Sequence, residues 1–155
     1  MIKNFSLLIV VISTWLNPVY SAEMTNSLPM KDKGASTFYI NGHIKGYGIT
    51  EFMVDTGSGY TTINENTLEI LKASGNATYV KKLRGILADG TEKIVPVYRI
   101  NTLTLGPSCE LHNVEAAVFP GKTRHILGLS TLRKTGTFTF SFEPPALVLN
   151  DCEQV

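Results

Sequence analysis

Turn-forming residues interrupt this chain at short intervals, and this spacing is the strongest limit on how it can fold. The segments between the turns are short and rich in β-branched and aromatic residues, which favour strands. They span residues 36–40, 43–54, 79–87, 92–105, 111–119, 138–142 and 146–149. Asn41-Gly42 and Asp89-Gly90 each separate two of these segments, a pattern typical of β-hairpins. The chain is therefore predicted to form a mostly all-β barrel or sandwich.

One segment has helical rather than strand character. Asn64 is a candidate N-cap, and an apolar stripe of Leu68, Ile70 and Leu71 follows it. Gly75 marks the end of this stripe. We expect a single short helix at this place.

The changes in composition along the chain predict an export signal followed by one folded domain. Lys3 precedes an apolar run that is too short for the roughly 20 residues that span a bilayer, so residues 1–22 are predicted to be a secretory signal peptide. Residues 23–35 are polar and irregular, and we expect a flexible N-terminal arm there. Residues 36–152 are the predicted domain. The protein is therefore expected to be exported, periplasmic or secreted, with no stable membrane span.

Charge and histidine spacing exclude several classes of function. Without residues 1–22, which contain one lysine, basic and acidic residues are equal in number, so nothing directs the chain to nucleic acid. His43, His112 and His125 lack the spacing of metal ligands. We therefore predict no metal and no cofactor.

Two cysteines, Cys109 and Cys152, remain in the predicted domain. An exported protein permits a disulfide between them. Two independent thiols or a bridge between chains are the alternatives, and the spacing alone does not choose among them.

An acidic residue at the end of an apolar strand is the main chemical signal. The run Phe52-Met53-Val54 leads into Asp55-Thr56-Gly57-Ser58-Gly59, and Ile126-Leu127-Gly128 follows about seventy residues later. This arrangement resembles the retropepsin-like aspartic peptidases, and the run from Leu129 to Leu132 looks most like their exported bacterial single-domain branch. The resemblance covers most of the chain from about Thr37 to Leu149. It implies a single-lobe acid-protease barrel with one short helix after the catalytic turn and a β-hairpin flap.

The resemblance also implies roles for individual residues. Asp55 is the catalytic residue, Thr56 and Gly57 support the catalytic loop, and Ser58 is expected to donate to the ionised carboxylate, which predicts an acidic optimum. Substrate-binding residues are expected in the catalytic loop and in the flap, namely Gly59, Ala88, Asp89 and Gly90. Packing beneath the loop is assigned to Ile126, Leu127 and Gly128.

A single Asp-Thr-Gly turn supplies only half of an aspartic peptidase dyad. Two carboxylates that share one proton provide both the base and the acid for peptide hydrolysis, so we expect a homodimer with Asp55 from each subunit. The predicted function is an aspartic endopeptidase that cleaves peptides or proteins between apolar residues. The alternative is a non-catalytic peptide-binding or dimerisation module on the same fold. Retroviral members brace this region with an acidic and a basic residue, whereas this chain has Gly59, Tyr60 and Leu129 there.

Overall fold

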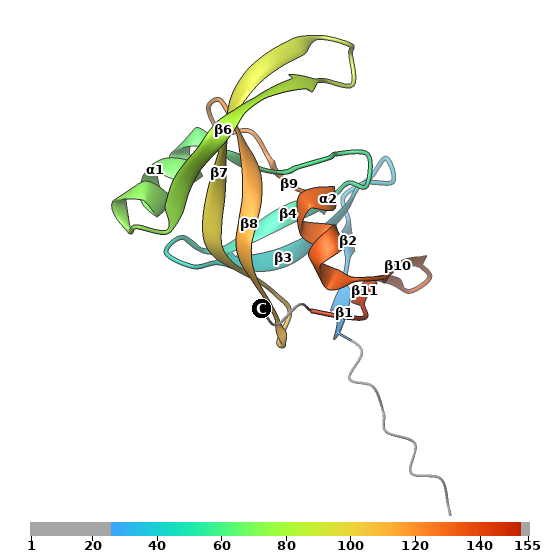
Figure 1. Cartoon of the computed structure of the whole chain (residues 1–155). Helices are drawn as coiled ribbons and strands as arrows, with labels where there is room; N and C mark the ends of the chain where they lie inside the picture. Colours follow the sequence, from blue (N-terminus) through green and yellow to red (C-terminus); the bar gives the residue numbers. More distant parts are fainter. Residues whose placement is uncertain (1–25, 153–155) are drawn as a thin grey trace, which may run out of the picture.

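The computed structural model describes residues 26–152, whose strands form two sheets around a common core (Figure 1). The larger sheet has the order β2-β3-β4-β9-β5-β8-β7-β6. Its strands are β2 (Lys31–Asp32), β3 (Phe38–Ile44), β4 (Gly48–Val54), β5 (Thr61–Asn64), β6 (Ala77–Ile86), β7 (Glu92–Leu105), β8 (Cys109–Phe119) and β9 (His125–Leu127). The smaller sheet has the order β1-β11-β10 and contains β1 (Asn26–Pro29), β10 (Phe138–Phe142) and β11 (Pro145–Leu149). The all-β prediction is confirmed.

A second pairing of β3 closes the larger sheet into a barrel. Along its whole length β3 is antiparallel to β4, and at its far end it also pairs with β7, where Gly42 lies opposite Leu105 and Ile44 opposite Leu103. Most of the buried side chains are apolar and form a continuous core. Its members with no measurable exposure include Ile44, Phe52, Ile63, Leu71, Leu103, Leu111 and Leu127.

The predicted helix is present as α1 (Glu65–Ala73). The Asn64 side chain caps it by accepting a hydrogen bond from the Thr67 N–H at 2.9 Å. Leu68 and Leu71 are buried as expected, but Ile70 is 48% exposed. The third buried position of the inner face is Thr67 instead.

The prediction of a flexible arm at residues 23–35 is wrong for the part of it that begins at Asn26. Asn26–Pro29 form β1, which pairs with β11 along four consecutive positions, and Asn26 itself is buried. Lys31–Asp32 form β2 against β3. The polar composition of this segment concealed the strands, because their backbone hydrogen bonds come from partners remote in sequence.

The predicted turn at Asn41-Gly42 is also wrong, because β3 runs straight through both residues. A Cβ at position 42 would lie 3.0 Å from the Phe52 ring and 3.2 Å from Leu105, so the glycine is needed for close packing rather than for a turn. The chain reverses at Lys45–Tyr47 instead. There Gly46 has a φ of +86°, and Gly48, the first residue of β4, has one of +111°.

The segment that follows Gly128 forms two short helical turns that the sequence analysis did not predict. These are α2 (Leu129–Leu132) and the 3₁₀ helix η1 (Arg133–Thr135). The protein therefore has helical structure beyond the single helix expected. Both turns lie between the end of β9 and the start of β10.

The predicted signal peptide, residues 1–22, lies outside the described residues. Among residues 26–152, no helix is long and apolar enough to cross a membrane.

Candidate active site

Asp55 begins a tight turn directly after β4. The Asp55 N–H donates to the Leu127 carbonyl at 3.1 Å, and the Ser58 N–H donates to the Asp55 carbonyl at 3.2 Å. The Gly57 N–H donates to Asp55 Oδ1 at 2.9 Å. Thr56 and Gly57 are exposed, and Asp55 is half-buried. The turn therefore holds one carboxylate oxygen with its own backbone and leaves the side chain accessible.

The Ile126-Leu127-Gly128 element lies beneath this turn, as the resemblance implies. Ile126 and Leu127 belong to β9, which is parallel to β4, with Ile126 opposite Met53 and Leu127 opposite Val54, and Gly128 follows as the N-cap of α2. A Cβ at position 128 would stand 2.2 Å from the Tyr60 carbonyl oxygen, so only glycine fits against this loop.

Residues that follow Gly128 bind the other end of the catalytic loop. The Leu129 N–H donates to the Ser58 carbonyl at 2.9 Å, and the Ser130 N–H donates to the Gly59 carbonyl at 3.1 Å. Together with the bond from Asp55 to Leu127, these contacts tie both ends of the loop to one continuous segment.

Hydroxyl groups add a second set of contacts that the sequence analysis missed. Ser130 Oγ accepts from the Thr61 N–H at 2.8 Å and donates to the Glu115 carbonyl at 2.8 Å. Thr61 Oγ1 accepts from the Gly128 N–H at 3.2 Å and shares a hydrogen bond with Thr131 Oγ1. The sequence signal for these contacts was the pairs of adjacent hydroxyl residues, Thr61-Thr62 and Ser130-Thr131, of which Thr61 and Thr131 are fully buried.

The predicted role of Ser58 is wrong. Its hydroxyl donates to the Tyr60 carbonyl at 2.7 Å, not to the Asp55 carboxylate. The turn directs the Ser58 side chain along its own loop, because its N–H already closes the turn onto Asp55. The expectation of an acidic optimum loses the basis it had in this hydrogen bond.

The hairpin of β6 and β7 projects beyond the barrel at the position expected for the flap (Figure 1). Between it and the catalytic turn lies a groove of about 1030 Å³ that reaches Asp55. Its walls are mainly apolar and come from the catalytic loop, both flap strands, β8 and β9. The apolar lining residues are Leu83, Ile86, Leu87, Ala88, Val95, Ala117, Phe119 and Ile126.

The predicted substrate-binding residues divide into two groups. Gly59 and Ala88 line the groove, whereas Asp89 and Gly90 do not. The Asp89 carboxylate accepts hydrogen bonds from the Thr91 hydroxyl at 2.7 Å and the Thr91 N–H at 2.9 Å, and these bonds lower the pKa of Asp89. Asp89 therefore shapes the turn of the hairpin.

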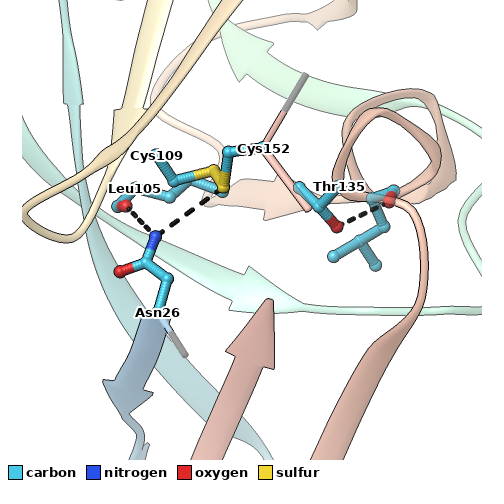
Figure 2. The surroundings of a disulfide bond; sticks show 6 residues. Asn26, Leu105, Cys109, Thr135 and Cys152 are labelled. Carbon is cyan, nitrogen blue, oxygen red and sulfur yellow. Dashed lines mark hydrogen bonds between the residues drawn. A yellow bond between two sulfur atoms is a disulfide. The ribbon is translucent and has the colours of Figure 1, made fainter. Parts of the chain in front are cut away.

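Cys109 and Cys152 form a disulfide that joins the start of β8 to the segment after β11. Figure 2 shows the Asn26 side chain beside it, with Nδ2 donating to the Leu105 carbonyl at 3.1 Å and to Cys152 Sγ at 3.8 Å. The disulfide thereby links the small sheet of terminal strands to the barrel.

Within residues 26–152, no group of three or more histidine, cysteine, aspartate or glutamate side chains is placed to hold a metal ion.

Comparison with known proteins supports one family. Residues 40–134 match the family described as "gag-polyprotein putative aspartyl protease", and this match spans more than half of the chain. Among solved structures, the fold is similar to a retropepsin-like aspartic protease from Rickettsia conorii. That similarity has a TM-score of 0.58 at 21% identity and covers 81% of this chain and 89% of the other. No curated protein sequence matches the chain. The chain belongs to the gag-polyprotein aspartyl protease family and has a single-lobe retropepsin-like fold.

Proposed function

We propose that the protein is an aspartic endopeptidase whose active site is completed by a second copy of the chain. The observation that carries this proposal is the accessible Asp55 carboxylate at the end of an apolar groove. The exposed Thr56-Gly57 backbone beside it offers a second subunit close access. Within the described residues the Thr56 hydroxyl makes no hydrogen bond, so it is available to a partner across a two-fold axis.

The proposed chemistry needs two carboxylates because peptide hydrolysis needs a base and an acid together. When Asp55 of each subunit lies within about 3 Å of the other, like charge keeps one proton on the pair. The ionised carboxylate takes a proton from water, whose oxygen attacks the peptide carbonyl carbon, while the other carboxyl protonates the carbonyl oxygen. The carboxylate that gave up its proton then takes one from a hydroxyl of the resulting diol, the other carboxyl gives its proton to the nitrogen, and the C–N bond breaks to leave a carboxylic acid and an amine.

The proposed substrate is an extended peptide. The hairpin of β6 and β7 presents backbone groups over the groove, and such groups bind extended peptides by main-chain hydrogen bonds. Alternate side chains of the peptide would then enter the apolar groove, which supports cleavage next to apolar residues. We also propose export, on the pattern of residues 1–22 alone.

The decisive experiment compares Asp55→Asn with the wild type on an unfolded protein substrate, with and without pepstatin. We expect the variant to lose about 10³-fold or more in rate, because it removes the shared proton chemistry. Asp32→Asn makes the same charge change at an exposed residue at the end of β2 and is the control. Equal cleavage by the Asp55 variant would exclude the proposal, and no cleavage by a folded wild-type dimer would favour a peptide-binding module.

Mixing the two proteins tests the shared site. If each dimer needs both aspartates, an equal mixture that exchanges subunits freely contains only about one quarter fully active dimers. If each aspartate acts alone, activity falls to about one half. Activity near one half would contradict the dyad while leaving the role of Asp55 intact.

A further inference from the structure

We propose that the groove selects peptides with an acidic side chain near the cleaved bond, and that Arg124, assisted by Lys93, binds that carboxylate. This inference rests on the proposed peptidase function and specifies its substrate class. Both cations line the same groove as Asp55, and both are exposed to it.

Arg124 lies on the wall of the groove, beside the strand that leads to Asp55. It directly precedes β9, whose Ile126 pairs with Met53 on the strand that ends before Asp55. Arg124 Nη1 lies 3.5 Å from Met53 Sδ, so the guanidinium lies over that strand. A peptide residue next to the scissile bond therefore passes within its reach.

Lys93 approaches the groove from the flap. Directly opposed residues of an antiparallel pair share one face of the sheet. Lys93 is opposite Gly85, and Val95 is opposite Leu83, and all four line the groove. Because Gly85 has no side chain, the face opposite Lys93 is open to a substrate side chain.

Neither groove cation has a carboxylate partner within the described chain. Asp55 is the one acidic residue among the groove-lining residues, and no ion pair involves Arg124 or Lys93 in residues 26–152. Lys81, in contrast, has Glu115 at 3.4 Å. The thioether of Met53 is only a weak acceptor for Arg124.

The flap turn does not neutralise Lys93 by direct contact. Asp89 is occupied by its two hydrogen bonds to Thr91, and Lys93 is the weakest cause of its lowered pKa. A carboxylate of the substrate would supply the missing acceptor, and the planar guanidinium of Arg124 suits a bidentate contact with it.

The test uses matched peptides that differ at one position, with Glu, Gln or Lys placed in turn on either side of an apolar scissile pair. Binding is measured first to the full chain carrying Asp55→Asn, by fluorescence anisotropy, so that turnover does not interfere. We expect the best Glu peptide to bind about tenfold more tightly than its Gln counterpart, equivalent to about 1.4 kcal/mol. Wild-type kcat/KM should show the same order. Below about pH 4 the preference should fade as the substrate carboxyl takes a proton.

Charge-reversal variants test whether Arg124 and Lys93 cause the preference for Glu. Arg124→Glu should abolish the preference for Glu and favour the Lys peptide, and Lys93→Glu should reduce the preference. Lys122→Glu and Arg99→Glu change exposed cations outside the groove-lining set and should leave the preference intact.

The outcomes separate this inference from the proposed function. Equal binding of Glu and Gln peptides at every position would overturn the inference, even if the wild type cleaves them. The inference would also be overturned if Lys122→Glu removed the preference for Glu as fully as Arg124→Glu does. A preference in binding without any cleavage by the wild type would support the acidic-ligand site and overturn the peptidase function instead.

Discussion

Replacing Gly128 by alanine tests whether the catalytic loop is held as closely as the structure shows. The new Cβ would lie 2.2 Å from the Tyr60 carbonyl oxygen, 2.5 Å from the Tyr60 carbonyl carbon and 2.8 Å from the Ser58 carbonyl oxygen. All three are backbone atoms, so no side chain can rotate away. The backbone of Gly128 itself has φ of −102° and ψ of −176°, which alanine adopts without strain. The cost of the substitution is therefore steric.

The magnitude follows from what must move. Inserting a methyl group into a packed site costs about 1–3 kcal/mol. Separating the two segments also weakens the hydrogen bonds from Leu129 to Ser58 and from Gly128 to Thr61, each contributing about 1 kcal/mol. We expect the free energy of unfolding to fall by about 3–5 kcal/mol, a large part of the roughly 5–15 kcal/mol typical of folded proteins.

Urea denaturation followed by circular dichroism measures this change. With an m-value of about 2 kcal/mol/M, the midpoint should fall by roughly 2 M. The matched control is Gly59→Ala, in the same loop, where no atom lies within 4 Å of the new Cβ and φ is not positive. We expect that control to stay within about 0.5 kcal/mol of the wild type. A Gly128→Ala protein as stable as the Gly59→Ala protein would refute the close packing of loop and β9.

Two further predictions concern stability. Replacing Cys109 and Cys152 together by alanine should lower the free energy of unfolding by about 4 kcal/mol, because the disulfide closes a chain loop with a sequence separation of 43. Urea denaturation of the variant and the wild type measures this loss, and a loss under about 1 kcal/mol would contradict the prediction. Burial holds the pKa of His125 below its ordinary value of 6.5 in the folded protein. As pH falls, the imidazole is therefore protonated in the unfolded chain before it is protonated in the folded one, and stability should decrease as pH drops below about 6.5. Denaturation at pH 8 and pH 5 should show a smaller loss for His125→Gln than for the wild type, and parallel losses would count against the buried histidine.

The sequence predicted those elements whose signals are local. The cap at Asn64, the hairpin turn at Gly90 and the alternation of residues 138–142 each depend on neighbours in the chain, and all three elements form as expected. The sequence did not decide whether Cys109 and Cys152 are paired, because the spacing of two cysteines in sequence does not give their distance in the fold. The predictions that failed concern elements that depend on contacts remote in sequence. β1 exists because β11 lies beside it, and Gly42 remains inside a strand because Phe52 and Leu105 pack on it.

The site shows the same division between local and remote causes. Asp55, Thr56 and Gly57 were singled out by the local Asp-Thr-Gly motif, and they form a tight turn in which the Gly57 N–H donates to the Asp55 carboxylate. Ser58 was misjudged because its place in the sequence does not choose an acceptor for its hydroxyl, and the folded loop directs it to the Tyr60 carbonyl. The partners of Ser130 were invisible, since Thr61 is far from it in sequence.

These remote contacts also explain how the loop can dispense with the charged pair of the retroviral members. Gly59 and Leu129 stand where the resemblance would place parts of that brace, yet both are bonded through their backbones to the facing segment. Backbone groups need no particular side chain, so Gly59 and Leu129 can vary without loosening the loop. Side-chain identity is then demanded where space or a hydroxyl is required, as at Gly128, Ser130 and Thr61. A charged brace sensitive to salt is thereby replaced by hydrogen bonds between uncharged groups, and the position of Asp55 should change little with ionic strength.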